Sequence, residues 1–171
     1  MIAQDRRATA APAARVAPVL QYHCVAMTTD HAETLESEPR RYILLAEDDD
    51  DTRMMLKHVL LLGGHDVIEA RDGMELMCFI SSVAVDERPP PDLIVSDIRM
   101  PIFSGLDMLR SAQRCAIDAP VVLISAFADE STRSLAEHLG AAALLRKPLS
   151  PDELLTTIAR VLPQRATGTS G

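Results

Sequence analysis

Short apolar runs alternate with amphipathic stretches along residues 42–162 of the chain. Each run is followed by apolar side chains at helical spacing, so the pattern predicts five strand–helix units. Helices that carry the chain back across a sheet leave its strands parallel, and we therefore expect an α/β domain. The predicted strands are Tyr42–Ala46, Val67–Ala70, Leu93–Ser96, Val121–Ile124 and Ala143–Arg146.

Start and stop signals for helices separate these strands. Gly63 and Gly64 are expected to end the first helix, and Gly140 the fourth. Asp72 is expected to begin the second helix. Residues 150–153 supply an N-cap serine, a proline at the first helical position and a capping-box glutamate for the last helix. Most of the eight methionines are expected to belong to the helix core.

A length of 171 residues and a hydrophobic content of 47% suit one globular domain with tails. We predict a disordered extension over residues 1–41, a domain over residues 42–162 and a disordered tail over residues 163–171. The apolar run Val16–Leu20 is interrupted by Pro18 and is too short for a signal peptide. No run reaches membrane-spanning length, so we expect no membrane association.

The charge balance argues against direct binding of nucleic acid. The formal net charge is −8, and the arginines of residues 1–41 are matched by acidic residues there, so the whole net charge belongs to the remainder of the chain. Such a domain lacks the basic clusters that displace counterions from a phosphate backbone. Cys24, Cys78 and Cys115 have neither metal-ligand spacing nor the density of a disulfide framework, which indicates a reducing, cytoplasmic location.

Polar residues suited to phosphate or metal chemistry follow four of the predicted strands. Glu47 and Asp48 follow the first, Asp97 the third, Ser125 the fourth and Lys147 the fifth. Ligands collect at the carboxyl ends of parallel strands, so we expect these side chains in one cleft. Three carboxylates in a cleft repel one another unless a cation compensates them, and oxygen ligands favour Mg²⁺. We predict that Asp97 attacks phosphorus while Lys147 and Ser125 hold the phosphoryl oxygens.

Each of these residues also has a plain structural interpretation. The acidic run over residues 47–51 is compatible with a solvated helix N-terminus, where negative side chains interact favourably with the helix dipole. Asp97 alone is compatible with a turn cap, Ser125 with a structural hydroxyl and Lys147 with a surface charge. Their joint position at strand ends favours the chemical interpretation.

Together these residues resemble the receiver domains of bacterial two-component response regulators, over about residues 42–162. The resemblance implies the flavodoxin-like (βα)5 doubly wound sandwich, with a five-stranded parallel sheet in the order 2-1-3-4-5. The motifs that carry the resemblance are Glu47 with Asp48, Asp97-Ile98-Arg99-Met100-Pro101 with Gly105 beyond, Ser125-Ala126, and Lys147-Pro148.

The resemblance also implies a role for each site residue. Asp97 accepts a phosphoryl group from the phosphohistidine of a histidine kinase or a histidine phosphotransfer protein. Asp48 and Asp97 bind Mg²⁺ directly, Glu47 acts mainly through water, and the main-chain carbonyl of Arg99 completes the protein ligands. Lys147 pairs with Asp97 or its phosphate, and the Lys-Pro bond that it begins is typically cis.

We therefore expect a stand-alone response regulator in the cytoplasm, without an attached output domain. Phosphorylation is expected to bias the fourth helix, the last strand and the last helix toward a downstream protein partner, and homodimer formation is left open. Beyond limited self-phosphorylation and self-dephosphorylation at Asp97, the domain is not expected to be an enzyme.

One position departs from the family pattern. Leu144, three residues before Lys147, replaces the aromatic ring that usually swings inward when the Ser125 hydroxyl moves onto the phosphate. Ser125 and Leu144 are the expected switch residues, and the smaller surface of leucine predicts weaker coupling to the last strand. Phe127 is a second candidate for the aromatic role.

Two other functions remain as alternatives. A pseudo-receiver would bind partners without phosphorylation, and Leu144 is the residue that keeps this alternative open. A phosphatase of the haloacid dehalogenase type is suggested by Asp48-x-Asp50-x-Thr52, which fits its nucleophile motif. That class needs a further acidic pair after another strand, whereas the acidic residues beyond Lys147 belong to a helix start.

Overall fold

A computed structural model describes residues 40–162, which form five strands and five helices in strict alternation. The strands are β1 (Tyr42–Ala46), β2 (Asp66–Ala70), β3 (Leu93–Asp97), β4 (Val121–Ser125) and β5 (Ala143–Arg146). The helices are α1 (Asp50–Leu62), α2 (Gly73–Ala84), α3 (Gly105–Arg114), α4 (Glu130–His138) and α5 (Pro151–Val161). Apart from Arg40 and Arg41, the extension expected over residues 1–41 lies outside the described residues, as does the tail expected over residues 163–171.

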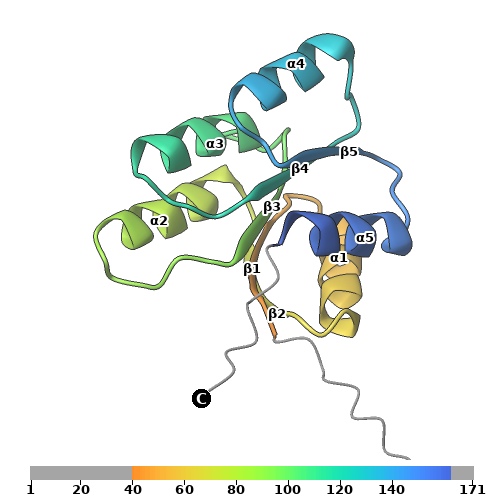
Figure 1. Ribbon diagram of the computed structural model, residues 1–171, viewed down its shortest axis with the longest axis horizontal. Helices are drawn as coiled ribbons and strands as arrows, with labels where there is room; N and C mark the ends of the chain where they lie inside the picture. Colours follow the sequence, from red (N-terminus) through yellow and green to blue (C-terminus); the bar gives the residue numbers. More distant parts are fainter. Residues whose placement is uncertain (1–39, 163–171) are drawn as a thin grey trace, which may run out of the picture. The chain divides into compact units, whose positions relative to one another are not determined.

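The strands form a parallel sheet in the order β2-β1-β3-β4-β5, so the expected flavodoxin-like topology is confirmed (Figure 1). All four strand pairs are parallel. In this order β1 lies between β2 and β3, while β2 and β5 form the two edges. The ends of β1 and β3 are therefore neighbours, and they carry all three acidic residues of the predicted site.

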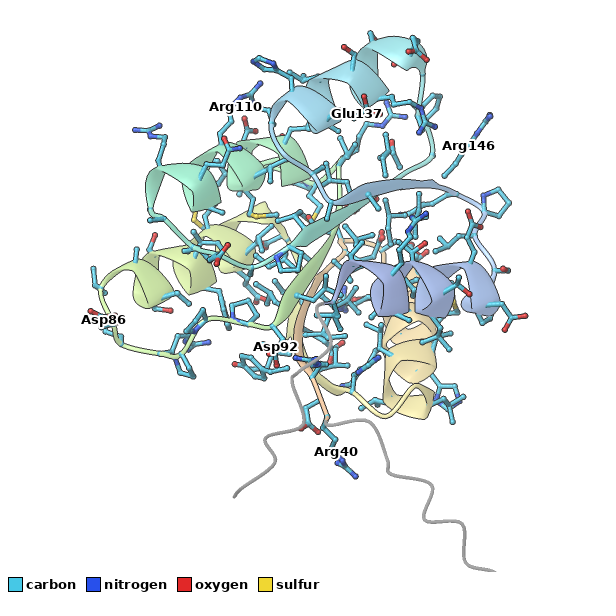
Figure 2. All side chains as sticks on the ribbon, in the orientation of Figure 1. Arg40, Asp86, Asp92, Arg110, Glu137 and Arg146 are labelled. Carbon is cyan, nitrogen blue, oxygen red and sulfur yellow. The ribbon has the colours of Figure 1, made fainter. Side chains whose placement is uncertain are left out.

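Helices cover both faces of the sheet, with α1 and α5 on one face and α2, α3 and α4 on the other (Figure 1). The side chains of a strand alternate between faces, so an apolar strand in this position needs a core on each side. In β1, Ile43 and Leu45 belong to the core under α1 and α5, whereas Leu44 and Ala46 belong to the core under the other three helices. Side chains fill the space between sheet and helices on both faces (Figure 2).

Each helix begins at a capping side chain that accepts a backbone N–H of the first turn, which satisfies a group that the helix itself leaves unpaired. The sequence signals at Asp72 and Ser150 correspond to two of these caps, and Ser104 forms a complete capping box with Asp107. Within residues 40–162, no helix is both long and apolar enough to cross a membrane. The capping residues are Asp49, Asp72, Ser104, Asp129 and Ser150.

Candidate functional site

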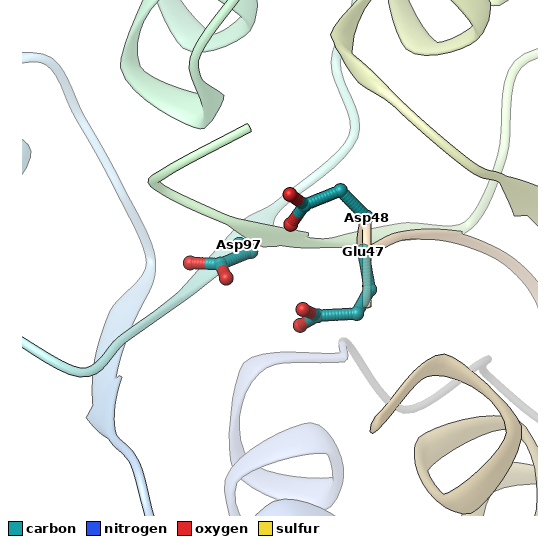
Figure 3. Close-up of side chains that lie close together, drawn as sticks. All are labelled: Glu47, Asp48 and Asp97. Atoms are coloured by element: carbon teal, nitrogen blue, oxygen red, sulfur yellow. The ribbon is translucent and has the colours of Figure 1, made fainter. Parts of the chain in front are cut away.

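Three carboxylates and one ammonium group meet at the carboxyl ends of the strands. The Lys147 Nζ atom lies 2.6 Å from Oδ2 of Asp97 and 2.6 Å from Oε2 of Glu47. Glu47, Asp48 and Asp97 each offer a carboxylate oxygen, and these oxygens lie within 4.8 Å of one another (Figure 3). The structure thus brings together four of the five side chains that the strand-end pattern singles out.

Asp97 is the last residue of β3, and the turn that follows fixes its orientation. Its side chain accepts the backbone N–H of Arg99 at Oδ1, with an N–O distance of 3.1 Å. The first turn of α3 packs directly on its main chain, because a Cβ atom built on Gly105 would lie only 2.5 Å from the Asp97 carbonyl oxygen. Glycine at position 105 is therefore required for close packing of α3 beside the acceptor strand.

Ser125 and Lys147 are positioned by the pairing of β4 with β5. The backbone N–H of Lys147 donates to the Ser125 carbonyl oxygen over 2.8 Å, and the Lys147–Pro148 peptide bond is cis. The Ser125 side chain is buried, and its hydroxyl oxygen accepts the backbone N–H of Phe127 over 3.1 Å. Ser125 and Lys147 are thus joined by a main-chain hydrogen bond, and the Ser125 hydroxyl interacts with the β4–α4 loop.

What we call the acidic pocket consists of the Glu47, Asp48 and Asp97 carboxylates and the Lys147 ammonium group, so it carries more negative than positive charge. Two of these groups have shifted pKa values. Burial raises the pKa of Glu47 above its ordinary value of 4.5, although the hydrogen bond from Lys147 lowers it, and the nearby charge of Asp97 adds to the increase. Burial of the Lys147 ammonium group lowers its pKa, but the hydrogen bonds to Asp97 and Glu47 bring the net value above 10.5. Lys147 is therefore protonated at neutral pH.

The donor set fits a hard divalent cation. All three acidic side chains offer oxygen, which is the ligand atom that Mg²⁺ prefers. Oε1 of Glu47 is buried and has no hydrogen-bond partner among residues 40–162, although a buried polar atom normally has one. A metal-bound water would supply the missing donor at that oxygen.

The acidic run over residues 47–51 divides into two parts with different roles in the structure. Glu47 and Asp48 belong to the carboxylate cluster with Asp97. Asp49 caps α1 by accepting the backbone N–H of Thr52 over 2.8 Å, and the next two aspartates occupy the first turn of the helix. The helix-start interpretation therefore holds for Asp49, Asp50 and Asp51, whereas Glu47 and Asp48 lie in the carboxylate cluster with Asp97.

Two contacts near the pocket have no counterpart in the sequence analysis. Arg53, on the buried face of α1, donates from Nη1 to the Glu47 carbonyl oxygen over 2.9 Å. Its spacing from Leu56 and Leu60 places it on the core side of the helix, which is the signal that could have identified it. The Arg99 guanidinium lies over the Phe127 ring, 3.7 Å from the ring centre, and joins the β3–α3 and β4–α4 loops.

Leu144 lies in the middle of β5 and is half-buried. It packs against the core under α2, α3 and α4. The exposed ring of Phe127 contacts the Arg99 guanidinium. In this structure, therefore, a leucine and not an aromatic ring lies on the α4 face of β5.

Comparison with solved structures gives the same fold. A chemotaxis response regulator, CheY4 of Vibrio cholerae, matches with a TM-score of 0.61 and 27% identity, over 72% of this chain and 99% of that one. A response regulator receiver domain protein from Clostridium thermocellum matches with a TM-score of 0.63 and 25% identity, over 70% of this chain and 92% of that one. Both matches extend over more than nine-tenths of the other chain.

Curated relatives are regulators of transcription by name. The transcriptional regulatory protein PdtaR of Mycobacterium tuberculosis is 34% identical over 133 residues, which are 77% of this chain and 61% of that protein. The probable transcriptional regulator ycf27 of Porphyridium aerugineum is 33% identical over 120 residues, or 70% of this chain and 47% of that one. The chain therefore spans about half to three-fifths of the length of these relatives. The family model of the response regulator receiver domain matches residues 43–159, and the chain belongs to this family of two-component signalling domains.

Proposed function

We propose that Asp97 accepts a phosphoryl group from the phosphohistidine of a histidine kinase or phosphotransfer protein, and that Mg²⁺ is required. The observation that carries this proposal is the Lys147 ammonium group, which lies 2.6 Å from the Asp97 carboxylate inside an acidic oxygen cluster. In the reaction a carboxylate oxygen of Asp97 attacks phosphorus, the phosphorus–nitrogen bond breaks, and the donor imidazole leaves.

Each pocket side chain has a place in this reaction. Asp48 and Asp97 would hold Mg²⁺ directly, Glu47 would hold it through water, and the Arg99 carbonyl would complete the protein ligands. When bound, the metal neutralises charge on the phosphoryl oxygens. Lys147 supplies a second positive charge to these oxygens, and the Ser125 hydroxyl donates one hydrogen bond after it exchanges its contact with Phe127.

The outer surface of α4, β5 and α5 is the proposed contact for a downstream protein. In α4 the buried residue is Ala136, whereas Leu135, Glu137 and other residues of the helix are exposed, so few contacts fix its position. Glu137 on α4 and Arg146 on β5 lie on the same side of the molecule (Figure 2). Leu144 lies beneath this surface, and we propose that it transmits the Ser125 movement with weaker coupling than an aromatic ring.

Receiver domains are in general signalling modules and not enzymes. Self-phosphorylation from small donors and self-dephosphorylation at Asp97 belong to the proposal. The phosphatase alternative is disfavoured because the Asp50 side chain is 87% exposed and pairs with Arg53 instead of entering the pocket. We further propose that output to transcription, the function named for the relatives, passes through a protein surface because the domain is acidic.

Intact mass measured after incubation with acetyl phosphate and Mg²⁺ tests the proposal. We expect one phosphoryl adduct on the wild type and on Asp66→Asn, a matched control at the opposite end of the sheet, and no adduct on Asp97→Asn. An adduct that survives in Asp97→Asn would overturn the assignment of the acceptor. An adduct that forms equally well in excess chelator would overturn the role of the metal.

A further inference from the structure

Arg53 is a buried cation, and one of its contacts is with the main chain of the acidic pocket. Its side chain is only 9% exposed. Nη1 donates to the Glu47 carbonyl oxygen over 2.9 Å, Nη2 pairs with Asp50, and Nε faces Oε2 of Glu69 at 3.4 Å. The guanidinium therefore connects the β1–α1 loop, the first turn of α1 and the edge strand β2.

The contact with the Glu47 carbonyl has a specific geometric consequence. This carbonyl belongs to the peptide bond that links Glu47 to Asp48, and a peptide bond is planar. Fixing its oxygen therefore fixes the plane between the two acidic residues. The N–H of Glu47 is also held, because it donates to the Ala70 carbonyl oxygen over 3.2 Å. The main chain is thus fixed on both sides of Glu47.

Glu69, which forms an ion pair with Arg53 but no hydrogen bond to its Nε atom, is itself held in place. Glu69 accepts a hydrogen bond from Lys57 at Oε1, 2.5 Å away, so its carboxylate lies between two cations. Burying a guanidinium carries a large desolvation cost before its contacts are counted, and an apolar side chain would fill the same space at lower cost. The planar fork of arginine can reach a carbonyl and a carboxylate simultaneously, which a lysine ammonium group cannot do with the same geometry.

We propose that Arg53 is a positioning residue for the magnesium pocket. It holds the Glu47–Asp48 peptide at the distance from Asp97 that lets the three acidic side chains share one cation. The inference rests on the proposed Mg²⁺ site. It means that residues of α1 and β2 support carboxylates that follow β1 and end β3.

The direction in which Mg²⁺ affinity changes when Arg53 is replaced distinguishes a positioning role from a purely electrostatic one. Arg53 is a cation near a cation site, so by charge alone its removal would strengthen Mg²⁺ binding. Positioning predicts the opposite, because residues that orient metal ligands typically change metal affinity by tenfold or more when they are removed. We expect Arg53→Met to weaken Mg²⁺ binding about tenfold.

The test compares Arg53→Met and Arg53→Lys with Lys57→Met, which removes the other cation from Glu69 and leaves the Glu47 carbonyl contact intact. Mg²⁺ affinity is measured by calorimetry and by amide chemical shifts, with circular dichroism to verify folding. The half-saturating Mg²⁺ concentration for phosphorylation by acetyl phosphate should rise in both Arg53 variants, while the rate at saturating Mg²⁺ returns close to that of the wild type. Lys57→Met should bind Mg²⁺ within about twofold of the wild type, well below the tenfold effect.

Arg53→Lys keeps the inference falsifiable if Arg53→Met does not fold, because it retains the buried charge. Unchanged or tighter Mg²⁺ binding in a folded Arg53 variant would overturn the inference and leave the proposed function intact. Equal weakening in Lys57→Met would also overturn it, since the effect would then belong to Glu69. A wild-type protein that binds no Mg²⁺ would overturn the proposed function together with this inference.

Discussion

Ile102 has a backbone conformation that its side chain disfavours. Its φ angle is 71°, in the left-handed region, although it is β-branched and 69% exposed. This conformation costs an L-residue about 1–2 kcal/mol, and the exposed side chain recovers little of that by burial. We expect Ile102→Asn to raise the free energy of unfolding by about 1 kcal/mol, as measured by urea denaturation.

The control for this prediction is Ile102→Val, which keeps the β-branched side chain. Valine shares the same steric restriction, so we expect a change within about 0.5 kcal/mol. If asparagine and valine give the same stability, the Ile102 side chain must make a compensating contact that offsets its backbone strain.

At the scale of single residues, the sequence predicted which residues lie at the strand ends, but it did not predict the conformations of their side chains. Glu47, Asp97 and Lys147 could be identified because parallel strands bring their carboxyl ends to one edge. That Lys147 contacts two carboxylates at once depends on side-chain torsions, which no spacing encodes. Arg53 was missed because a charged residue on the core face of a helix is rare unless it is paired, and its partners come from three separate segments.

Two helices end in the same way with different residues, which gives a matched pair of substitutions. After α3, Ala116 has φ 53° and Ile117 N–H donates to the Ala112 carbonyl oxygen over 3.0 Å. After α4, Gly140 has φ 75° and Ala141 N–H donates to Ala136 over 2.9 Å. We expect Ala116→Gly to stabilise the protein by about 0.5–1 kcal/mol and Gly140→Ala to destabilise it by about 1 kcal/mol, both by urea denaturation.

The two substitutions check each other. Glycine adopts the left-handed conformation without steric strain but loses more conformational entropy on folding than alanine does. The same balance applies at both positions, so the stability changes of Ala116→Gly and Gly140→Ala should have opposite sign and similar size. Loss of stability in both variants would show that the space around each helix end, and not the φ angle, decides the outcome.

The capping box of α3 predicts a pH-dependent contribution to stability. The hydrogen bond from the Ser104 hydroxyl, with the one from its backbone N–H, lowers the pKa of Asp107 below its ordinary value of 3.8. A carboxyl group whose pKa is lower in the folded state stabilises the fold above pH 3.8, and the contribution is lost as the pH falls through the folded-state pKa. Asp107→Asn should cost about 0.5–1 kcal/mol at neutral pH and progressively less in acid.

Denaturation curves of the wild type and Asp107→Asn across this pH range measure that difference. Ser104→Ala supplies the control, because without the serine hydroxyl the Asp107 charge has less to stabilise. The same Asp107→Asn substitution in the Ser104→Ala background should therefore cost less at neutral pH. A difference between wild type and Asp107→Asn that does not change with pH would contradict the assignment.

At the scale of elements, apolar runs predicted the strands to within one residue, because all five lie in a sheet covered on both faces. The expected burial of helical methionines was partly wrong. Met54 is 67% exposed, and Met55 and Met74 are exposed as well, whereas Met108 is fully buried. Helix α1 is apolar around most of its circumference, so periodicity alone does not identify the face that contacts the sheet.

At the scale of the whole molecule, one cation would link elements that the chain places far apart. Glu47 and Asp48 follow β1, Asp97 ends β3, and Lys147 begins the segment after β5. Lys147 compensates part of the negative charge and the uncompensated remainder is concentrated at one end of the sheet. The apo fold is therefore expected to bear a repulsion that a bound metal removes.

Metal binding should consequently raise the stability of the entire domain. A ligand that binds only the folded state adds about 2.7 kcal/mol to the free energy of unfolding at one hundred times its Kd. We expect this increase for the wild type when Mg²⁺ is added to that level, with the urea midpoint raised and the slope unchanged. Asp48→Ala should show no such increase in Mg²⁺. In excess chelator this variant should be no less stable than the wild type, because removing one of three clustered carboxylates relieves their mutual repulsion. NaCl at matched ionic strength is the control for charge screening. If the urea midpoint of the wild type rose equally in NaCl and in MgCl₂, general screening, and not a metal bound to the acidic pocket, would account for the added stability.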